Sequence, residues 1–174
     1  MNDNNFAGNS KSAIDFLGNE WKYDCMGCAI ARGDIKIPGG IIYDGEFSVL
    51  GADPEIPIPG FLVISLKRHA NSFSELNKAE RNEIGNIIYT AEKAMRELNI
   101  ATEVTLVQEE RSKHFHVWIF PNHSWMTEKF GKGITYLRDI SSYAQKNANK
   151  EDIKEILDCI EKIREYFEQH NIGE

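Results

Sequence analysis

The sequence predicts a mixed α+β fold in one compact domain with a helical C-terminal end. Its 174 residues, of which 41% are hydrophobic, are enough to bury one sizeable core. Short apolar runs rich in β-branched and aromatic residues indicate strands. Two longer segments repeat apolar residues at helical intervals, which predicts amphipathic helices.

The chain is expected to have three parts. Residues 1–20 contain Asn, Gly and Ser with little periodicity, so we expect a loosely ordered segment unless Phe16, Leu17 and Trp21 pack against the rest of the protein. Residues 21–125 are expected to form the main domain. Residues 126–174 are expected to be a helical extension packed on that same domain.

Four strands are predicted in the main domain. Residues 46–51 and 61–66 are apolar runs, and the loop between them contains three prolines, which remove backbone donors and disfavour both helix and central strand. Residues 103–108 and 114–120 are predicted as two further strands, joined by the charged link EERSK.

Two helices are predicted from capping residues that precede apolar periodicity. Asn77 and Glu80 have the spacing of a capping box, and the helix that follows is expected to end near Asn99. Asn149 is expected to cap a last helix with an apolar stripe. Cys159 lies beside that stripe, and we expect it to be an inert packing residue.

Charge and hydropathy predict a soluble, cytoplasmic protein. The formal net charge of -7 and the pI near 5.3 argue against the clustered Lys and Arg that bind a nucleic acid polymer. No apolar run is long enough to span a membrane, and the polar start lacks the order of a secretory signal. Three cysteines argue against a disulfide framework, so the close pair Cys25 and Cys28 requires a metal, redox or accidental explanation.

The segment HFHVWIFP, residues 114–121, places two histidines on a predicted strand. Side chains of a strand alternate between its faces, so His114, His116 and Trp118 share one face while the residues between them face the core. The two imidazoles are then roughly 6 to 7 Å apart along the backbone, close enough to serve one site. The alternative is a pair of surface histidines on an exposed sheet face.

Cys25, Cys28 and His69 extend this pattern toward a metal site. A Cys-x2-Cys pair and two histidines supply the four sulfur and nitrogen ligands that tetrahedral zinc prefers. A redox pair is the alternative, but such a pair usually opens a helix after a strand, whereas this motif is near the start of the ordered chain. The sequence therefore favours zinc.

Together these residues resemble the family of histidine-triad nucleotide hydrolases and transferases. The resemblance covers about residues 24–121, through CMGC, GIIYDGEFSVL, PGFLVISLKRH, SELNKAE and HFHVW, and the order C-x-x-C, KRH, H-x-H is more specific than any single motif. It implies an antiparallel sheet flanked by helices, and a homodimer. From the zinc-containing branch it also implies that Cys25, Cys28, His69 and His114 bind a structural Zn2+.

The same resemblance implies that His116 is a nucleophile acting on a nucleotide or dinucleotide. Its neutral ring nitrogen would attack the α-phosphorus and form a nucleotidyl-histidine, while a hydrogen-bond acceptor on the other nitrogen fixes the tautomer. Water or another phosphate would then resolve the intermediate. Charge on the nonbridging oxygens would have to be stabilised by the surrounding site.

Three residues, Asp53, Arg111 and Trp118, are expected to contact the substrate, and the resemblance places Asp53 near the position where relatives contact ribose. Trp118 replaces the third triad histidine and cannot transfer a proton near neutral pH, although its indole can stack on a base or cover the core. The link EERSK replaces the family's phosphate-binding loop, and its Arg111 and Lys113 can offset the two carboxylates. Asp53 either contacts the ribose or caps its own loop.

Two alternative functions stay open. One is a metal-dependent hydrolase in which His114 and His116 both bind a catalytic zinc and water completes the sphere. The other is a noncatalytic nucleotide-binding protein that keeps the scaffold but has lost turnover through Trp118 and the changed link.

Overall fold

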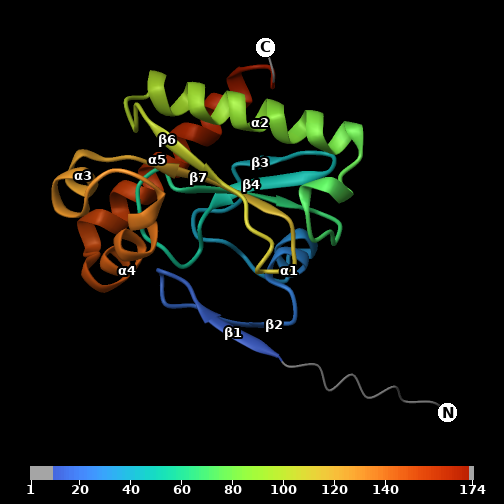
Figure 1. Ribbon diagram of the computed structural model, residues 1–174, viewed down its shortest axis with the longest axis horizontal. Coiled ribbons are helices and arrows are strands. Elements are labelled where there is room, and N and C mark those ends of the chain that lie inside the picture. The colour runs from blue at the N-terminus through green and yellow to red at the C-terminus, as the bar shows by residue number, and fades with distance from the viewer. Residues whose placement is uncertain (1–9, 173–174) are drawn as a thin grey trace.

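The computed structural model describes residues 10–172, in which two α-helices lie between strands in the sequence and three follow the last strand (Figure 1). The strands are β1 (Lys11–Ile14), β2 (Glu20–Tyr23), β3 (Tyr43–Asp44), β4 (Ser48–Ala52), β5 (Leu62–Leu66), β6 (Val104–Val107) and β7 (His116–Pro121). The helices are α1 (Met26–Arg32), α2 (Lys78–Glu97), α3 (Ser124–Phe130), α4 (Leu137–Asn147) and α5 (Lys150–Gln169). Short 3-10 turns lie at Phe73–Glu75 and Ile134–Tyr136.

The main sheet has five antiparallel strands in the order β3-β4-β5-β7-β6. The predicted strands correspond to β4, β5, β6 and β7, and the α+β class with an antiparallel sheet is confirmed. One strand begins later than expected. β7 starts at His116 because the backbone N–H of His114 points to the Ser112 hydroxyl, 3.4 Å away, rather than to a neighbouring strand.

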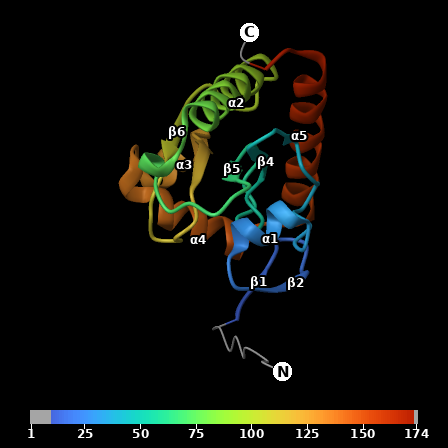
Figure 2. The same ribbon diagram turned by 90° about the vertical axis from the view of Figure 1, so that its right-hand side faces the viewer.

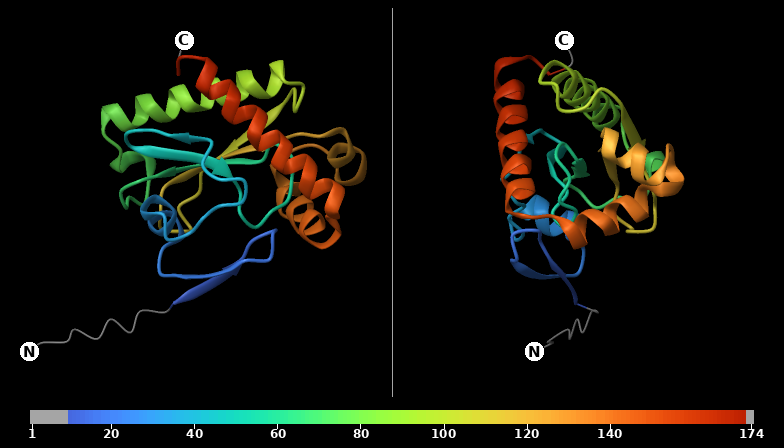
Figure 3. Two further views of the ribbon diagram at one scale, coloured as in Figure 1. Left: turned by 180° about the vertical axis from the view of Figure 1, so that it is seen from behind. Right: turned by 90° about the vertical axis from the view of Figure 1, so that its left-hand side faces the viewer.

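Helices α2 and α5 cover one face of this sheet, and both begin as predicted. Asn77 and Glu80 form a capping box at the start of α2, and Asn149 forms one with Asp152 at the start of α5. The two helices pack against each other, and Figure 3 shows α5 crossing the molecule from α4 toward α2. Beyond α2, Asn99 adopts the left-handed conformation that ends many helices.

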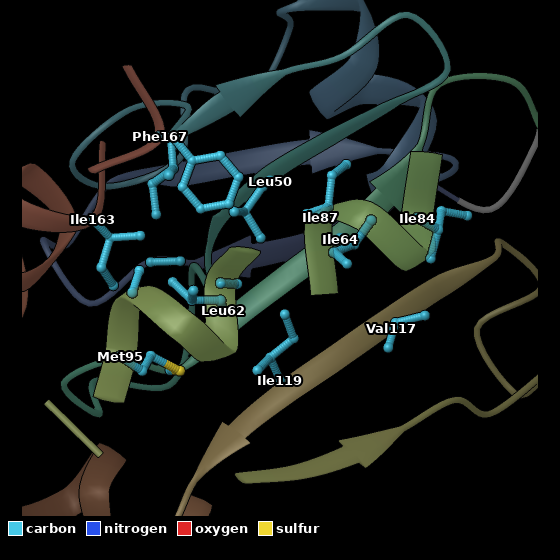
Figure 4. Packing of buried hydrophobic residues seen from close by; sticks show 14 of the residues in the cluster. Leu50, Leu62, Ile64, Ile84, Ile87, Met95, Val117, Ile119, Ile163 and Phe167 are labelled. Carbon is cyan, nitrogen blue, oxygen red and sulfur yellow. The ribbon is translucent and has the colours of Figure 1, made fainter. Parts of the chain in front are cut away.

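The core lies between these helices and the sheet (Figure 4). Alternate residues of the central strands, Leu62, Ile64, Val117 and Ile119, point into it. The remaining buried members shared by the sheet and the two helices include Leu50, Leu66, Ile84, Ile87, Ala91, Met95, Phe115, Ile156, Ile160, Ile163 and Phe167. The C-terminal helix is therefore part of the same core as the sheet.

The N-terminal part of the chain packs more firmly than its composition predicts. Residues 1–9 lie outside the described residues, but from Lys11 onward β1 and β2 form an antiparallel hairpin on the side of the sheet away from α2 (Figures 1 and 2). Phe16 packs against the main core and Trp21 packs against the residues around α1, while Leu17 stays 47% exposed. Packing of Phe16 and Trp21 against the rest of the protein thus holds the hairpin in place.

Helices α3 and α4 form a second cluster beside the proline loop. Ile58 and Phe61 of that loop, with Phe120 of β7, pack against Met126 and Ile140. Cys159 is buried in α5, and burial raises the pKa of its thiol to about 11, as expected of an inert packing residue. Within residues 10–172, no helix has the length and apolarity needed to cross a bilayer.

Candidate nucleotide and metal site

The face of the sheet opposite the main core lines a cavity of about 280 Å³. Its floor consists of alternate residues from three neighbouring strands: Val49 and Gly51 of β4, Val63 and Ser65 of β5, and His116 and Trp118 of β7. The hairpin, α1 and the proline loop supply the remaining walls. A sheet face with histidine and tryptophan on one of its inner strands therefore lines a partly open cavity rather than a flat surface.

A candidate metal site borders this cavity. The ligand atoms of Cys25, Cys28, His69 and His114 all lie within 4.8 Å of one another. The two sulfurs lie 3.2 and 3.5 Å from Nδ1 of His114, and 3.6 and 3.4 Å from Nδ1 of His69. Tetrahedral zinc with ordinary Zn–S and Zn–N bonds places nitrogen and sulfur roughly 3.5 Å apart. The four residues thus form a ligand set suited to Zn2+, as the motif predicts.

Local structure explains how the two cysteines meet. Cys25 has an extended backbone and is the N-cap of α1, and Cys28 lies within the first turn of that helix. The pKa of the Cys28 thiol is raised to about 11, mainly by burial and further by the neighbouring Cys25. A bound cation reverses this effect, because a coordinating thiol is deprotonated by the metal's charge.

His114 is held in the form that binds metal. Its ring is buried, and Nε2 lies 2.8 Å from the carbonyl oxygen of Leu66, so Nε2–H donates and the Nδ1 lone pair faces the two sulfurs. Burial lowers the pKa of this histidine, and the nearby His69 and His116 lower it further. The neutral imidazole that a metal requires is therefore the favoured form.

Gly27 is a site residue that the sequence reasoning did not identify. A Cβ atom at this position would lie 2.2 Å from the His114 ring, closer than any real contact. Gly27 therefore lets α1 press directly on the ring that faces the thiols. Its position between Cys25 and Cys28 was visible in the sequence, but the ring it contacts comes from residue 114, which only the fold places there.

Gly27→Ala is expected to reduce zinc retention while leaving the four ligands chemically intact. The added methyl group must displace the His114 ring or α1, and zinc binding depends on ligand positions held within a few tenths of an ångström. Competition with a chromogenic chelator should show zinc affinity at least roughly 10-fold weaker than in the wild type. Gly85→Ala, in α2 with no atom near its Cβ and no left-handed backbone, controls for a general effect of adding a methyl group to a helix. Equal affinity in Gly27→Ala and the wild type would contradict this packing role.

His116 is oriented by the backbone of the first histidine. Its Nδ1 lies 2.9 Å from the carbonyl oxygen of His114 and 3.2 Å from the hydroxyl oxygen of Ser112, so Nδ1 carries the proton. No hydrogen bond within residues 10–172 engages Nε2, which keeps a free lone pair in a residue that lines the cavity. Ser112, which also donates to the His114 carbonyl at 2.9 Å, is a second neighbour that sequence spacing did not reveal.

Asp53 lines the cavity and caps its own loop. Its Oδ1 accepts hydrogen bonds of 2.9 Å from the backbone N–H groups of both Glu55 and Ile56. The side chain is buried, and burial raises its pKa to about 7 despite these two bonds. The loop-capping role is therefore present in the structure, while a ribose contact stays a prediction.

Asp53→Asn is expected to change the pH dependence of stability. Because the folded-state pKa lies above the ordinary value, the contribution of Asp53 is fully present below about pH 4 and is lost as the pH rises through about 7. The amide oxygen keeps both backbone bonds without a charge. At pH 8 the variant should melt roughly 5 °C above the wild type, and at pH 4 the difference should vanish. Thermal unfolding at both pH values measures this, and a variant less stable at pH 8 would contradict it.

The other two predicted substrate residues are placed differently. Trp118 lines the cavity and packs edge-on against Phe61, with ring centroids 5.3 Å apart. Arg111 is not among the residues that line the cavity, and its guanidinium group donates to the carboxylate of Glu109. Its predicted contact with substrate requires the link to rearrange, and that role stays a prediction.

No protein-family model and no curated protein matches the chain. Solved structures do match it. One is a hypothetical histidine triad nucleotide-binding protein from Sulfolobus tokodaii, with 19% identity, coverage of 86% of this chain and 97% of that chain, and a TM-score of 0.57. Another is a Zn-bound histidine triad family protein from Mycobacterium smegmatis, with 15% identity, coverage of 81% and 96%, and a TM-score of 0.55.

A third similar structure is a Hit-like protein from Bartonella henselae described as involved in cell-cycle regulation, with 16% identity, coverage of 80% and 93%, and a TM-score of 0.56. These likenesses extend over most of each chain. The protein therefore has the histidine-triad fold, as the resemblance in its motifs implies.

Proposed function

We propose that the protein is a nucleotide hydrolase or nucleotidyl transferase that attacks the α-phosphate through a nucleotidyl-histidine on His116. The observation that carries this proposal is the state of His116, whose Nδ1–H is held by the His114 carbonyl while Nε2 is free in a cavity wall. A neutral imidazole with one nitrogen fixed and the other unengaged is the form that acts as a nucleophile.

The reaction would proceed in two displacements. The Nε2 lone pair attacks the phosphorus, the leaving group departs with its electron pair, and a nucleotidyl-histidine forms. Water or a second phosphate then attacks the same phosphorus, and Nε2 leaves as the neutral imidazole while the incoming group releases its proton. During both steps the His114 carbonyl, 2.9 Å from Nδ1, stabilises the positive charge that develops on the ring.

The zinc in this proposal is structural. When bound, it supplies a cross-link between α1, the end of β5 and the start of β7. His116 does not belong to the ligand cluster, and its Nδ1 is engaged by a backbone carbonyl rather than facing the thiols. This arrangement supports a structural role over a catalytic metal on both histidines. The Zn-bound histidine triad protein from Mycobacterium smegmatis, which has a similar fold, supports the binding of zinc itself.

The remaining parts of the proposal come from the sequence. A nucleotide or dinucleotide substrate agrees with the nucleotide-binding description of the similar Sulfolobus tokodaii protein. We further propose a cytoplasmic homodimer in which Asp53, Trp118 and a rearranged Arg111 contact the substrate. Sedimentation of the purified protein at several concentrations tests the dimer.

The decisive experiment is to trap the covalent intermediate. Zinc-loaded protein is mixed with a panel of nucleoside 5′-phosphate esters, anhydrides and amidates, quenched in alkali because a phosphorus–nitrogen bond to histidine is acid-labile, and weighed by mass spectrometry. The mass should rise by one nucleotidyl group, and peptide mapping should place that group on His116. Turnover with the label on another residue would overturn the assignment.

A noncatalytic nucleotide-binding protein is the second candidate, and Trp118 favours it. The indole occupies the position of the third triad histidine and offers the cavity no group that transfers a proton at neutral pH. Binding of nucleotides by calorimetry, with no product and no adduct for any member of the panel, would select this function.

A further inference from the structure

The N-terminal hairpin turns one face toward the molecule. In the register of β1 and β2, Lys11 lies opposite Tyr23 and Ala13 lies opposite Trp21. Residues directly opposite each other share a face, and so do residues two apart along one strand. Ala13 is buried and the two aromatic residues are half-buried, so this face is the packed one. Lys11 and Tyr23 line the cavity that contains His116.

The charge of the cavity walls makes Lys11 distinctive. Among the residues that line the cavity, Lys11 is the one Lys or Arg side chain, whereas Asp24, Asp53 and Glu55 supply three carboxyl groups. Asp24 and the ionised forms of Asp53 and Glu55 repel a phosphate group in this cavity. Lys11 is the lining lysine or arginine that can offset this repulsion.

Four other cations near the site are paired with carboxylates at 2.8 Å or less: Arg32 with Asp34, Lys67 with Asp44, Arg68 with Glu80 and Arg111 with Glu109. Lys113 precedes His114 in the sequence and is in no ion pair of the described residues, but it is not among the residues that line the cavity. None of the ion pairs within residues 10–172 includes Lys11. Its ammonium group can therefore bind a ligand without breaking an ion pair of the protein.

We infer that Lys11, carried by the N-terminal hairpin, is the residue that binds the phosphate group of a nucleotide beside His116. This inference rests on the proposed function and adds to it a phosphate-binding residue from outside the region that resembles the histidine-triad family. A lysine side chain suits the role because its compact charge sits on a flexible stem and can follow a phosphoryl group from substrate to adduct. The hairpin then has two roles: it forms one wall of the cavity and it supplies the cavity's cation.

The test compares two lysines of the same hairpin. Lys22 lies on β2 with its side chain on the opposite, exposed face, so Lys22→Met removes the same charge from the same element outside the cavity. Binding of the four nucleoside 5′-monophosphates and the four nucleosides is measured by calorimetry with zinc-loaded wild type, Lys11→Met, Lys11→Arg and Lys22→Met.

The expected result separates phosphate binding from packing. Lys11→Met should weaken binding of the preferred monophosphate about 10-fold, because a hydrogen bond to a charged group is lost. Lys11→Arg should recover most of the affinity. Lys22→Met should stay within about 2-fold of the wild type, since an exposed charge that makes no contact contributes little. Nucleoside binding should be the same in all four proteins.

Three other results would overturn the inference about Lys11. They also show whether the proposed function fails with it. If the wild type binds monophosphates and the two methionine variants bind them equally, Lys11 is not the phosphate-binding residue, while the proposed function stands. If Lys11→Met weakens nucleosides and monophosphates alike, the residue acts through packing of the hairpin. If the wild type binds no nucleotide, the proposed function fails and this inference fails with it.

Discussion

His114→Ala is expected to purify with little zinc and to melt about 10 °C below the wild type. The variant removes one of four ligands and leaves two thiols and one histidine around an incomplete site. A metal bound only by the folded form stabilises that form by mass action, so losing the metal removes stabilisation of about 3 kcal/mol or more. The lost cross-link joins α1 to the start of β7. Zinc per chain and the melting temperature are the two measurements.

His123→Ala is the matched control for that variant. His123 is also a histidine on a loop next to β7, but its ring hydrogen-bonds to the carbonyl of Pro59 at 2.7 Å and lies outside the ligand cluster. It should keep about one zinc per chain. Adding a chelator to the wild type should reproduce the melting temperature of His114→Ala. Wild-type protein that is folded, metal-free and unaffected by chelator would show that the cysteine and histidine cluster holds no zinc.

His116→Ala is expected to keep its zinc and its melting temperature but to lose adduct formation completely. The substitution leaves all four ligands of the metal site in place and removes the side chain that carries the proposed nucleophile. Turnover on any nucleotide that the wild type consumes should fall at least roughly 1,000-fold. Metal analysis, thermal unfolding and the trapping experiment are carried out on the same preparation.

The zinc content of His116→Ala distinguishes a nucleophile from a metal ligand at this position. If His116→Ala loses zinc in proportion to His114→Ala, both histidines bind the metal and the nucleophile assignment is wrong. If His116→Ala keeps zinc and still forms the adduct, the covalent bond is made by another residue. A preserved metal with no adduct is the one pattern that agrees with separate roles for the two histidines.

Much of the fold was predictable because its main elements carry local signals. Asn77 and Asn149 begin helices that have long apolar stripes, and the four predicted strands are short runs that contain β-branched or aromatic residues. Helix α1 has only seven residues and no apolar stripe, so periodicity does not reveal it. The β1–β2 hairpin is also weakly encoded locally, and its order depends on tertiary contacts of Phe16 and Trp21.

The candidate site was predictable to the extent that spacing and residue type define it. The sequence order of two cysteines, a histidine and a His-x-His pair was enough to select four side chains that the fold brings together. Sequence spacing could not show that Arg111 turns to Glu109, because side-chain direction in a link depends on its local turn. It also could not show that Gly27 touches His114, since the two lie in elements far apart in the chain.

His114 contributes to two neighbours through different atoms. Its ring faces the thiols of Cys25 and Cys28, and its backbone carbonyl holds Nδ1 of His116. Any shift of this residue therefore changes metal affinity and nucleophile orientation together. Coupling of this kind is reciprocal, so a nucleotide that binds better to the metal-loaded protein must raise the affinity for the metal by the same factor. With such a nucleotide present, a chelator should remove zinc from the protein less readily.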